Sequence, residues 1–182
     1  MKAGKIIQRF NAKDGKEVIL RTPKWEDLDD FMEYINSLVE EGADIIRDQK
    51  VTRDQEADWL GRKLALLEKG EEFYLVAEVK GKVIALSELQ RKKGCSSHVA
   101  GIAIGISKNY RNIGIGTEIL KTLISQAKTM GLKMLNIEAF STNKRAIHVY
   151  EKVGFKKTGS RPKLFYRNGK YMDEILMTQE IC

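Results

Sequence analysis

The chain has 182 residues, of which 42% are hydrophobic and 31% charged, and it carries a formal net charge of +7. Such a composition is typical of a globular protein with one sizeable core, so we expect a single domain over residues 1–182. No apolar run approaches the roughly 20 residues of a membrane span, and residues 1–10 lack the apolar stretch of a secretory signal. We therefore expect a cytoplasmic protein without membrane contact.

Two short strands followed by two helices are predicted for the first part of the chain. Thr22 and Pro23 have the residue types of a helix N-cap and first helical position. Thr52 and Gln55 form the capping-box pattern of the second helix. The predicted strands cover residues 5–10 and 17–21, and the predicted helices run from Thr22 to Gly42 and from Thr52 to Gly70.

Alternating and β-branched patterns predict the remaining elements. Asn168-Gly169 is the strongest two-residue hairpin signal in the chain. The resulting order is a mixed α/β layout, with strands running as hairpins and a strand–helix–strand–helix unit in the second half. The further strands are predicted at 73–79, 82–90, 97–107, 133–140, 163–167 and 170–180, and the helices at 117–130 and 143–153.

A glycine-spaced loop, residues 110–117, joins a β-branched strand to an amphipathic helix and reads Tyr-Arg-Asn-Ile-Gly-Ile-Gly-Thr. Free N–H groups at a helix N-terminus attract anions, and glycines let the backbone approach them. The P-loop is excluded because Gly116 is followed by Thr117 and Glu118, and the dinucleotide fingerprint because its third glycine would fall on Ile119. A different phosphate-bearing ligand is therefore expected here.

A second pattern spans residues 143–155 and reads Asn-x-x-Ala-x-x-x-Tyr-Glu-x-x-Gly-Phe. Asn143 is placed to cap a helix, and Tyr150 lies two turns further on, roughly on the same face. Together with the Arg-x-x-Gly-x-Gly loop, this pattern resembles the two signatures of the GCN5-related N-acetyltransferase (GNAT) family. The resemblance covers about residues 18–177.

The resemblance implies an α/β (α+β) fold with a mixed, mostly antiparallel central sheet and flanking helices. In that fold, the strands before and after the cofactor helix run parallel and splay apart. The resemblance also implies acetyl-CoA as cosubstrate, no metal, and direct transfer of the acetyl group to a primary amine in a ternary complex.

The resemblance assigns roles to individual residues as well. Asn143 would touch the cofactor, and Tyr150 would act as general acid toward the departing thiolate, unless it is a core aromatic with a satisfied hydroxyl. Arg111 would be exposed, contacting either the adenosine 3′-phosphate side or only solvent. The backbone of Ile104 and Ile106 would pair with the pantetheine arm, and the amides of Asn112, Ile113, Gly114, Ile115, Gly116 and Thr117 would bind the pyrophosphate.

The general base is the clearest departure from one branch of the family, which places a Glu on the strand before the glycine loop. Residues 100–106 contain no acid. A second branch, the ribosomal-protein N-terminal acetyltransferases, takes its base from the position that Glu138 occupies here. The alternatives are that Glu138 faces solvent or that water relays the proton to another acid.

The acceptor amine is open between a protein N-terminus and a small polyamine- or aminoglycoside-like amine. The competing functions are a basic nucleic-acid-binding module, which we do not favour because acids are interleaved with the lysines, and a coenzyme A sensor without catalysis. A homodimer is left open. His98, His148, Cys95 and Cys182 match no metal or nucleophile spacing. The acids expected near the amine are Glu41, Asp44, Glu88, Asp173 and Glu174, and the alternative for Asp173 is pairing with a neighbouring Lys or Arg.

Overall fold

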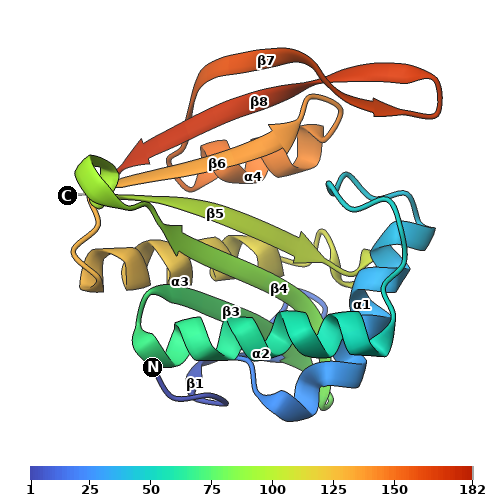
Figure 1. Cartoon of the computed structure of the whole chain (residues 1–182), viewed down its shortest axis with the longest axis vertical. Coiled ribbons are helices and arrows are strands. Elements are labelled where there is room, and N and C mark those ends of the chain that lie inside the picture. Colours follow the sequence, from blue (N-terminus) through green and yellow to red (C-terminus); the bar gives the residue numbers. More distant parts are fainter. Residues whose placement is uncertain (182) are drawn as a thin grey trace.

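An eight-stranded mixed sheet runs through the part of the chain that the structure describes (Figure 1). The structure is a computed structural model that describes residues 1–181. The strand order is β1-β2-β3-β4-β5-β6-β8-β7, and every neighbouring pair is antiparallel except β5 and β6. The strands are β1 (Ile6–Asn11), β2 (Glu17–Arg21), β3 (Glu72–Val79), β4 (Lys82–Arg91), β5 (Val99–Ile106), β6 (Met134–Phe140), β7 (Lys156–Arg167) and β8 (Lys170–Glu180).

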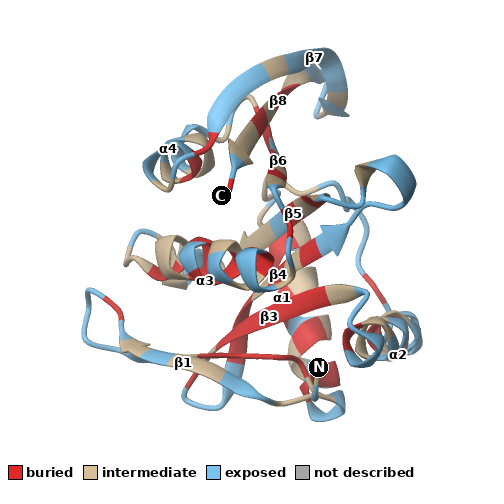
Figure 2. Ribbon diagram, turned by 90° about the vertical axis from the view of Figure 1, so that its left-hand side faces the viewer, coloured by how far each residue is buried: buried red, intermediate tan, exposed pale blue. Residues whose placement is uncertain are grey.

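Helices cover both faces of the sheet, α3 and α4 on one side and α1 and α2 on the other (Figure 2). Leu123 of α3 belongs to a buried cluster that includes Leu135 and Ile137 of β6, whereas Phe31 of α1 packs in a second cluster with Leu60 of α2. The helices are α1 (Leu28–Glu40), α2 (Arg53–Lys69), α3 (Ile115–Thr129) and α4 (Lys144–Lys152). The expected mixed fold with flanking helices is therefore confirmed.

The parallel pair β5 and β6 opens along its length. The two strands pair only from Val99 opposite Met134 to Ile102 opposite Ile137. Beyond that point residues 103–106 still pair with β4, and residues 138–140 with β8, but not with each other. Figure 1 shows the two strands diverging toward the connection between α1 and α2. The predicted splayed pair is confirmed, and it leaves two facing backbone edges unpaired.

The start of the first helix differs from the prediction. The Thr22 side chain accepts a hydrogen bond from the Lys5 N–H (2.8 Å) and donates to the Lys2 carbonyl (2.9 Å), so it extends the β1–β2 hairpin and caps no helix. A short 3₁₀ turn, Trp25–Asp27, follows, and α1 begins at Leu28. The predicted N-cap was wrong because residues 2 and 5, just before β1, occupy the hydroxyl.

Strand β7 begins seven residues before the predicted start, at Lys156. It is an edge strand, exposed along most of its length, and it lacks the apolar alternation that identifies a half-buried strand. Pro162 and a register shift between Arg161 and Phe165 interrupt its pairing with β8. Edge strands of this kind avoid pairing with other chains, which explains why the sequence signal was absent.

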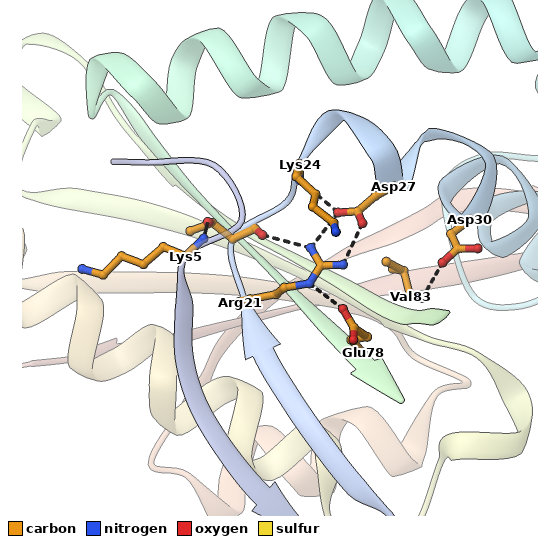
Figure 3. Close-up of polar contacts among 8 residues, drawn as sticks. Lys5, Arg21, Lys24, Asp27, Asp30, Glu78 and Val83 are labelled. Atoms are coloured by element: carbon orange, nitrogen blue, oxygen red, sulfur yellow. Dashed lines mark hydrogen bonds and ion pairs between the residues drawn. The ribbon is translucent and has the colours of Figure 1, made fainter. Parts of the chain in front are cut away.

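A buried ion-pair network anchors the first helix to the sheet (Figure 3). The Arg21 guanidinium donates to both carboxylate oxygens of Asp27, each at 2.7 Å, to Glu78 at 2.7 Å and to the Thr22 carbonyl at 3.1 Å. Asp27 also accepts from the Lys24 N–H at 2.9 Å. Strands β2 and β3 are thereby tied to the turn from which α1 starts.

Candidate active site

A cavity of about 1650 Å³ lies where β5 and β6 separate. Its walls come from residues 102–106 of β5 and residues 138–140 of β6, with α1 and the α1–α2 connection on one face of the sheet and α3 and α4 on the other. The cavity therefore connects the two faces through the gap in the sheet. Every cofactor residue expected from the sequence except Ile115, which is buried below the loop, lines this cavity.

The glycine loop presents free backbone donors to the cavity. Within residues 1–181, the N–H groups of residues 112–116 donate to no acceptor, whereas those of Thr117 and Glu118 bond to the Gly114 carbonyl at 3.1 and 3.2 Å. Helix α3 thus begins at Ile115 with Gly114 as N-cap, two residues earlier than predicted. Five consecutive unbonded donors at a helix N-terminus make a binding site for an anion.

Steric constraints explain why the loop has glycine at positions 114 and 116. Gly114 has φ of 93°, a conformation that L-residues rarely adopt, and a Cβ at Gly116 would lie 3.2 Å from Cδ1 of Ile106. The β1–β2 hairpin supports the loop from outside, since the Lys13 N–H donates to the Ile113 carbonyl at 3.0 Å. The sequence pattern did not reveal Lys13, because one hundred residues separate it from the loop.

Arg111 does not point into solvent, so the expectation of an exposed side chain was wrong. Its Nε donates to the Ile106 carbonyl at 2.7 Å, and its guanidinium forms an ion pair with Glu41. Only 17% of the side chain is exposed. Arg111 therefore ties the glycine loop to the C-terminal end of α1, and Glu41 offsets its charge.

Helix α4 carries the second pattern. Asn143 is its N-cap, with Oδ1 accepting from the Ala146 N–H at 3.1 Å, as predicted. The Tyr150 ring is buried, 6.3 Å from the ring of Phe155, and its hydroxyl finds no hydrogen-bond partner among residues 1–181. Among the described polar side-chain atoms that are fully shielded from solvent, only Oε1 of Gln179 lacks a hydrogen-bond partner. The unpaired Tyr150 hydroxyl is therefore not fully shielded, and it keeps access to the cavity.

Glu138 is an exposed residue of β6 that lines the open cavity, and it lies close enough to Tyr150 for its charge to act on the hydroxyl. Its carboxylate has no hydrogen bond or ion pair within the described chain. Partial burial, and then the charge of Glu174, raise the pKa of Glu138, while Arg161 and Lys92 oppose the rise. Burial, and then the charge of Glu138, raise the pKa of the Tyr150 hydroxyl well above its ordinary value.

Of the other expected acids, all but Asp173 line the cavity. Glu88 accepts from Lys63 at 3.1 Å, and Glu174 pairs with Arg161 at 2.6 Å. Asp173 lies outside the cavity wall and accepts from the Lys163 N–H at 2.9 Å. The acids that line the cavity are Glu41, Asp44, Glu88, Glu118, Glu138 and Glu174.

The connection between α1 and α2 is held over the cavity by a residue that sequence reasoning missed. Arg167, at the tip of the β7–β8 hairpin, donates to the carbonyls of Gly42, Ala43 and Ile45 at 3.2, 2.6 and 2.7 Å. The contact spans more than 120 residues and uses backbone acceptors, so no motif marks it.

The lack of a side chain at Gly105 makes room for Tyr34 of α1 in the cavity wall. Replacing Gly105 therefore tests how far this contact matters for stability. A methyl group at Gly105 would overlap the Tyr34 hydroxyl, so Gly105→Ala is expected to cost about 1–3 kcal/mol of unfolding free energy. Gly101→Ala on the same strand meets nothing within 4 Å and should change stability little. Urea denaturation of both variants checks this; equal losses would contradict the steric account.

The described residues contain no group of three or more His, Cys, Asp or Glu side chains that could hold a metal ion. Cys95 is a free, exposed thiol in the β4–β5 connection, and Cys182 lies outside the described residues. His148 lines the cavity on α4, whereas His98 does not. No helix of residues 1–181 is both long and apolar enough to cross a membrane.

The splayed parallel pair, the glycine loop and the cavity between them define an acyl-CoA N-acyltransferase fold. The Acetyltransferase (GNAT) family profile matches residues 33–155. The chain belongs to this family, which confirms the resemblance seen in its two sequence patterns.

Two curated relatives and two solved structures set the context. The chain is similar to "Probable N-acetyltransferase camello" of Xenopus tropicalis, at 31% identity over 85 residues, which are 47% of this chain and 39% of that protein. It is also similar to the L-amino acid N-acetyltransferase AaaT of Escherichia coli K12, at 28% identity over 107 residues, 58% of this chain and 66% of that protein. The match spans less than two thirds of each relative.

The structural neighbours cover nearly the whole chain. The ribosomal-protein-S5-alanine acetyltransferase of Vibrio fischeri has a TM-score of 0.83 at 19% identity, covering 96% of this chain and 97% of its own. The phosphinothricin acetyltransferase of Sinorhizobium meliloti in complex with acetyl-CoA has a TM-score of 0.79 at 20% identity, covering 90% and 88%. At these identities the likeness establishes the fold.

Proposed function

We propose that the protein is an acetyl-CoA-dependent N-acetyltransferase that acts on a primary amine. The observation that carries the proposal is the run of five free N–H groups, residues 112–116, beside the unpaired edges of β5 and β6. The loop suits a pyrophosphate, and the free edge of β5 suits an extended chain with amide groups, much as an added strand would pair. Both features belong to one cavity.

The residues present fit this cosubstrate, which supplies an acetyl group activated as a thioester. In the proposal, the amides of residues 112–116 hold the phosphates, with the Thr117 hydroxyl beside them. The backbone of Ile104 and Ile106 aligns the arm, and Asn143 borders it from α4. Arg111 contributes by fixing the loop to α1, since its guanidinium is already engaged.

The chemical roles fall to two side chains with unpaired polar groups. Glu138 accepts the proton that the incoming ammonium must lose, and Tyr150 donates a proton at the sulfur of the leaving thiolate. Backbone N–H groups of the central strand polarise the reacting carbonyl. The acceptor is a protein N-terminus or a polyamine-like amine, and we further propose a cytoplasmic location.

Thermal denaturation with acetyl-CoA tests the proposal first. At 100 times its dissociation constant, a ligand that binds only the folded state adds about 2.7 kcal/mol, which raises Tm by several degrees. Release of free thiol over a panel of amines then tests the chemistry. The absence of both stabilisation and thiol release would reject the proposed function.

Glu138→Gln is expected to lower kcat/KM by about 10²-fold and to remove the acid limb of the pH profile. Because the folded-state pKa is raised above the ordinary value of about 4.3, wild-type kcat/KM should increase with pH above that value as the carboxylate forms. Glu151→Gln, exposed on α4, is the matched control. An unchanged acid limb in Glu138→Gln would remove Glu138 as the base.

A readout independent of activity follows from the same shift. A raised folded-state pKa means that the folded state favours the protonated carboxyl of Glu138. The contribution of this group to the free energy of unfolding is therefore present below the unfolded pKa and is lost as the pH rises through the folded pKa. Glu138→Gln should therefore match the wild type near pH 4 and be more stable at pH 7. Denaturation curves at the two pH values check the sign.

A further inference from the structure

Three carboxylates cross the α1/α2 face of the sheet as a row. Glu88 lies on β4, opposite Ala103 of β5; Glu138 lies on β6, opposite Leu176 of β8; and Glu174 lies two residues before Leu176, on the same face. All three carboxylates line the cavity. The small Ala103 leaves the space between Glu88 and Glu138 open.

Both ends of the row are neutralised, and its centre is not. Lys63 of α2 pairs with Glu88 at 3.1 Å, and Arg161 of β7 pairs with Glu174 at 2.6 Å. Glu138 has no such partner among residues 1–181. The charged groups that act on it are Glu174, Arg161 and Lys92, and the neutral Tyr150 hydroxyl is also near. Arg161 and Lys92 both lie outside the cavity wall.

The guanidinium groups on this side are already engaged. Arg111 is bonded to Glu41 and to a carbonyl, Arg161 to Glu174, and Arg167 to three carbonyls. The other cations in the cavity wall belong to α3 and α4 on the opposite face, to the turn before the glycine loop or to the hairpin bonded to that loop. These cations are Lys13, Lys108, Lys121, Lys128, Arg145 and Lys152.

We propose that the acceptor site takes a cationic amine with no carboxylate on the adjacent carbon, and that it excludes free α-amino acids. The inference rests on the proposed function and specifies its substrate class. An ammonium group meets the unpaired Glu138, whereas an α-carboxylate would sit among Glu138, Glu174 and Glu88, and the described cavity wall on this face of the sheet holds no free cation to pair with it. During transfer the carbon–nitrogen bond forms as the carbon–sulfur bond breaks. Glu138 receives the amine proton, and Tyr150 supplies the proton to sulfur.

The test uses pairs of substrates that differ by one carboxylate: L-phenylalanine with 2-phenylethylamine, and L-arginine with agmatine. Losing the carboxylate makes the amine no more acidic, so easier deprotonation cannot explain a preference for the second member. We expect kcat/KM for thiol release to be at least about 10-fold higher for the amines. Spermidine and alanyl-alaninamide, both free of carboxylate, then separate a polyamine from a peptide N-terminus as the source of the amine.

A variant supplies the missing cation. Glu174→Gln releases Arg161 beside the cavity, so the amine-to-amino-acid ratio is expected to fall by about 10-fold, with Glu151→Gln as the unchanged control. Melting curves establish that both variants are folded; if Glu174→Gln is not, the wild-type ratio decides. A wild-type ratio of one or less overturns the inference, as does a ratio unaltered in folded Glu174→Gln.

The inference and the proposed function fail in different ways. Stabilisation by acetyl-CoA with equal turnover of amino acids rejects the substrate class alone. Stabilisation without thiol release from any carboxylate-free amine also rejects it. The absence of both stabilisation and thiol release across the whole panel rejects the function itself.

Discussion

Replacing Tyr150 by Phe is expected to lower kcat by about 10²- to 10³-fold while leaving the thermal stabilisation by acetyl-CoA unchanged. The substitution removes one hydroxyl and keeps the buried ring, which packs near Phe155. Because that hydroxyl has no protein partner within residues 1–181, its removal orphans no donor or acceptor. The variant should therefore fold with wild-type stability, so a loss of rate reports on chemistry.

The measurement is steady-state thiol release at saturating acetyl-CoA and amine, beside a melting curve with and without the cosubstrate. Tyr166→Phe, on an exposed ring of β7 outside the cavity, is the matched control and should retain its rate. Because the pKa of Tyr150 is raised, the hydroxyl stays protonated at alkaline pH, and wild-type kcat should not decline below about pH 10. An unchanged kcat in Tyr150→Phe would mean that Tyr150 is a core aromatic residue and not the general acid.

Local sequence patterns predicted the parts of the site that depend on neighbouring residues. The glycine loop and the Asn143 cap follow from signals within one loop and one helix, whereas the splayed strands around α3 were implied by the family resemblance; the structure has all three. The free hydroxyl of Tyr150 is different. The sequence left it open between a satisfied core group and a proton donor, because only the packing of β6 against α4 shows whether a partner is near.

Contacts between distant segments account for what the sequence did not reveal. Thr22 has an ideal residue type for a helix cap, yet its hydroxyl bonds to the backbone of Lys5 and Lys2, just before β1. In the sequence, Arg111 has the character of a free cation, but in the structure the end of α1 places Glu41, seventy residues away, beside it. Arg167 binds carbonyl groups, which every residue carries and no pattern can mark. Side-chain partners in the site were therefore predictable only where they lie within one helix or turn.

Replacing Arg21 by Met is expected to lower the free energy of unfolding by about 3–5 kcal/mol. Arg21 is 5% exposed and Asp27 3%, so the substitution strands charges in the interior. Asp27 would keep the N–H of Lys24 as a donor, whereas Glu78 would lose the ion pair that Arg21 provides. Asp27 belongs to the turn from which α1 starts, and the same helix carries Tyr34 and ends at Glu41, both in the cavity wall.

Urea denaturation of Arg21→Met and of Arg9→Met separates burial from charge. Arg9 also pairs with a carboxylate, Glu17 at 3.2 Å, but both side chains are more than half exposed, so its loss should cost less than about 1 kcal/mol. Adding Asp27→Asn and Glu78→Gln to Arg21→Met removes the stranded charges and should restore part of the loss. Equal effects of the two single substitutions, or no recovery in the triple variant, would mean that the network in Figure 3 does not anchor α1 through its buried charges.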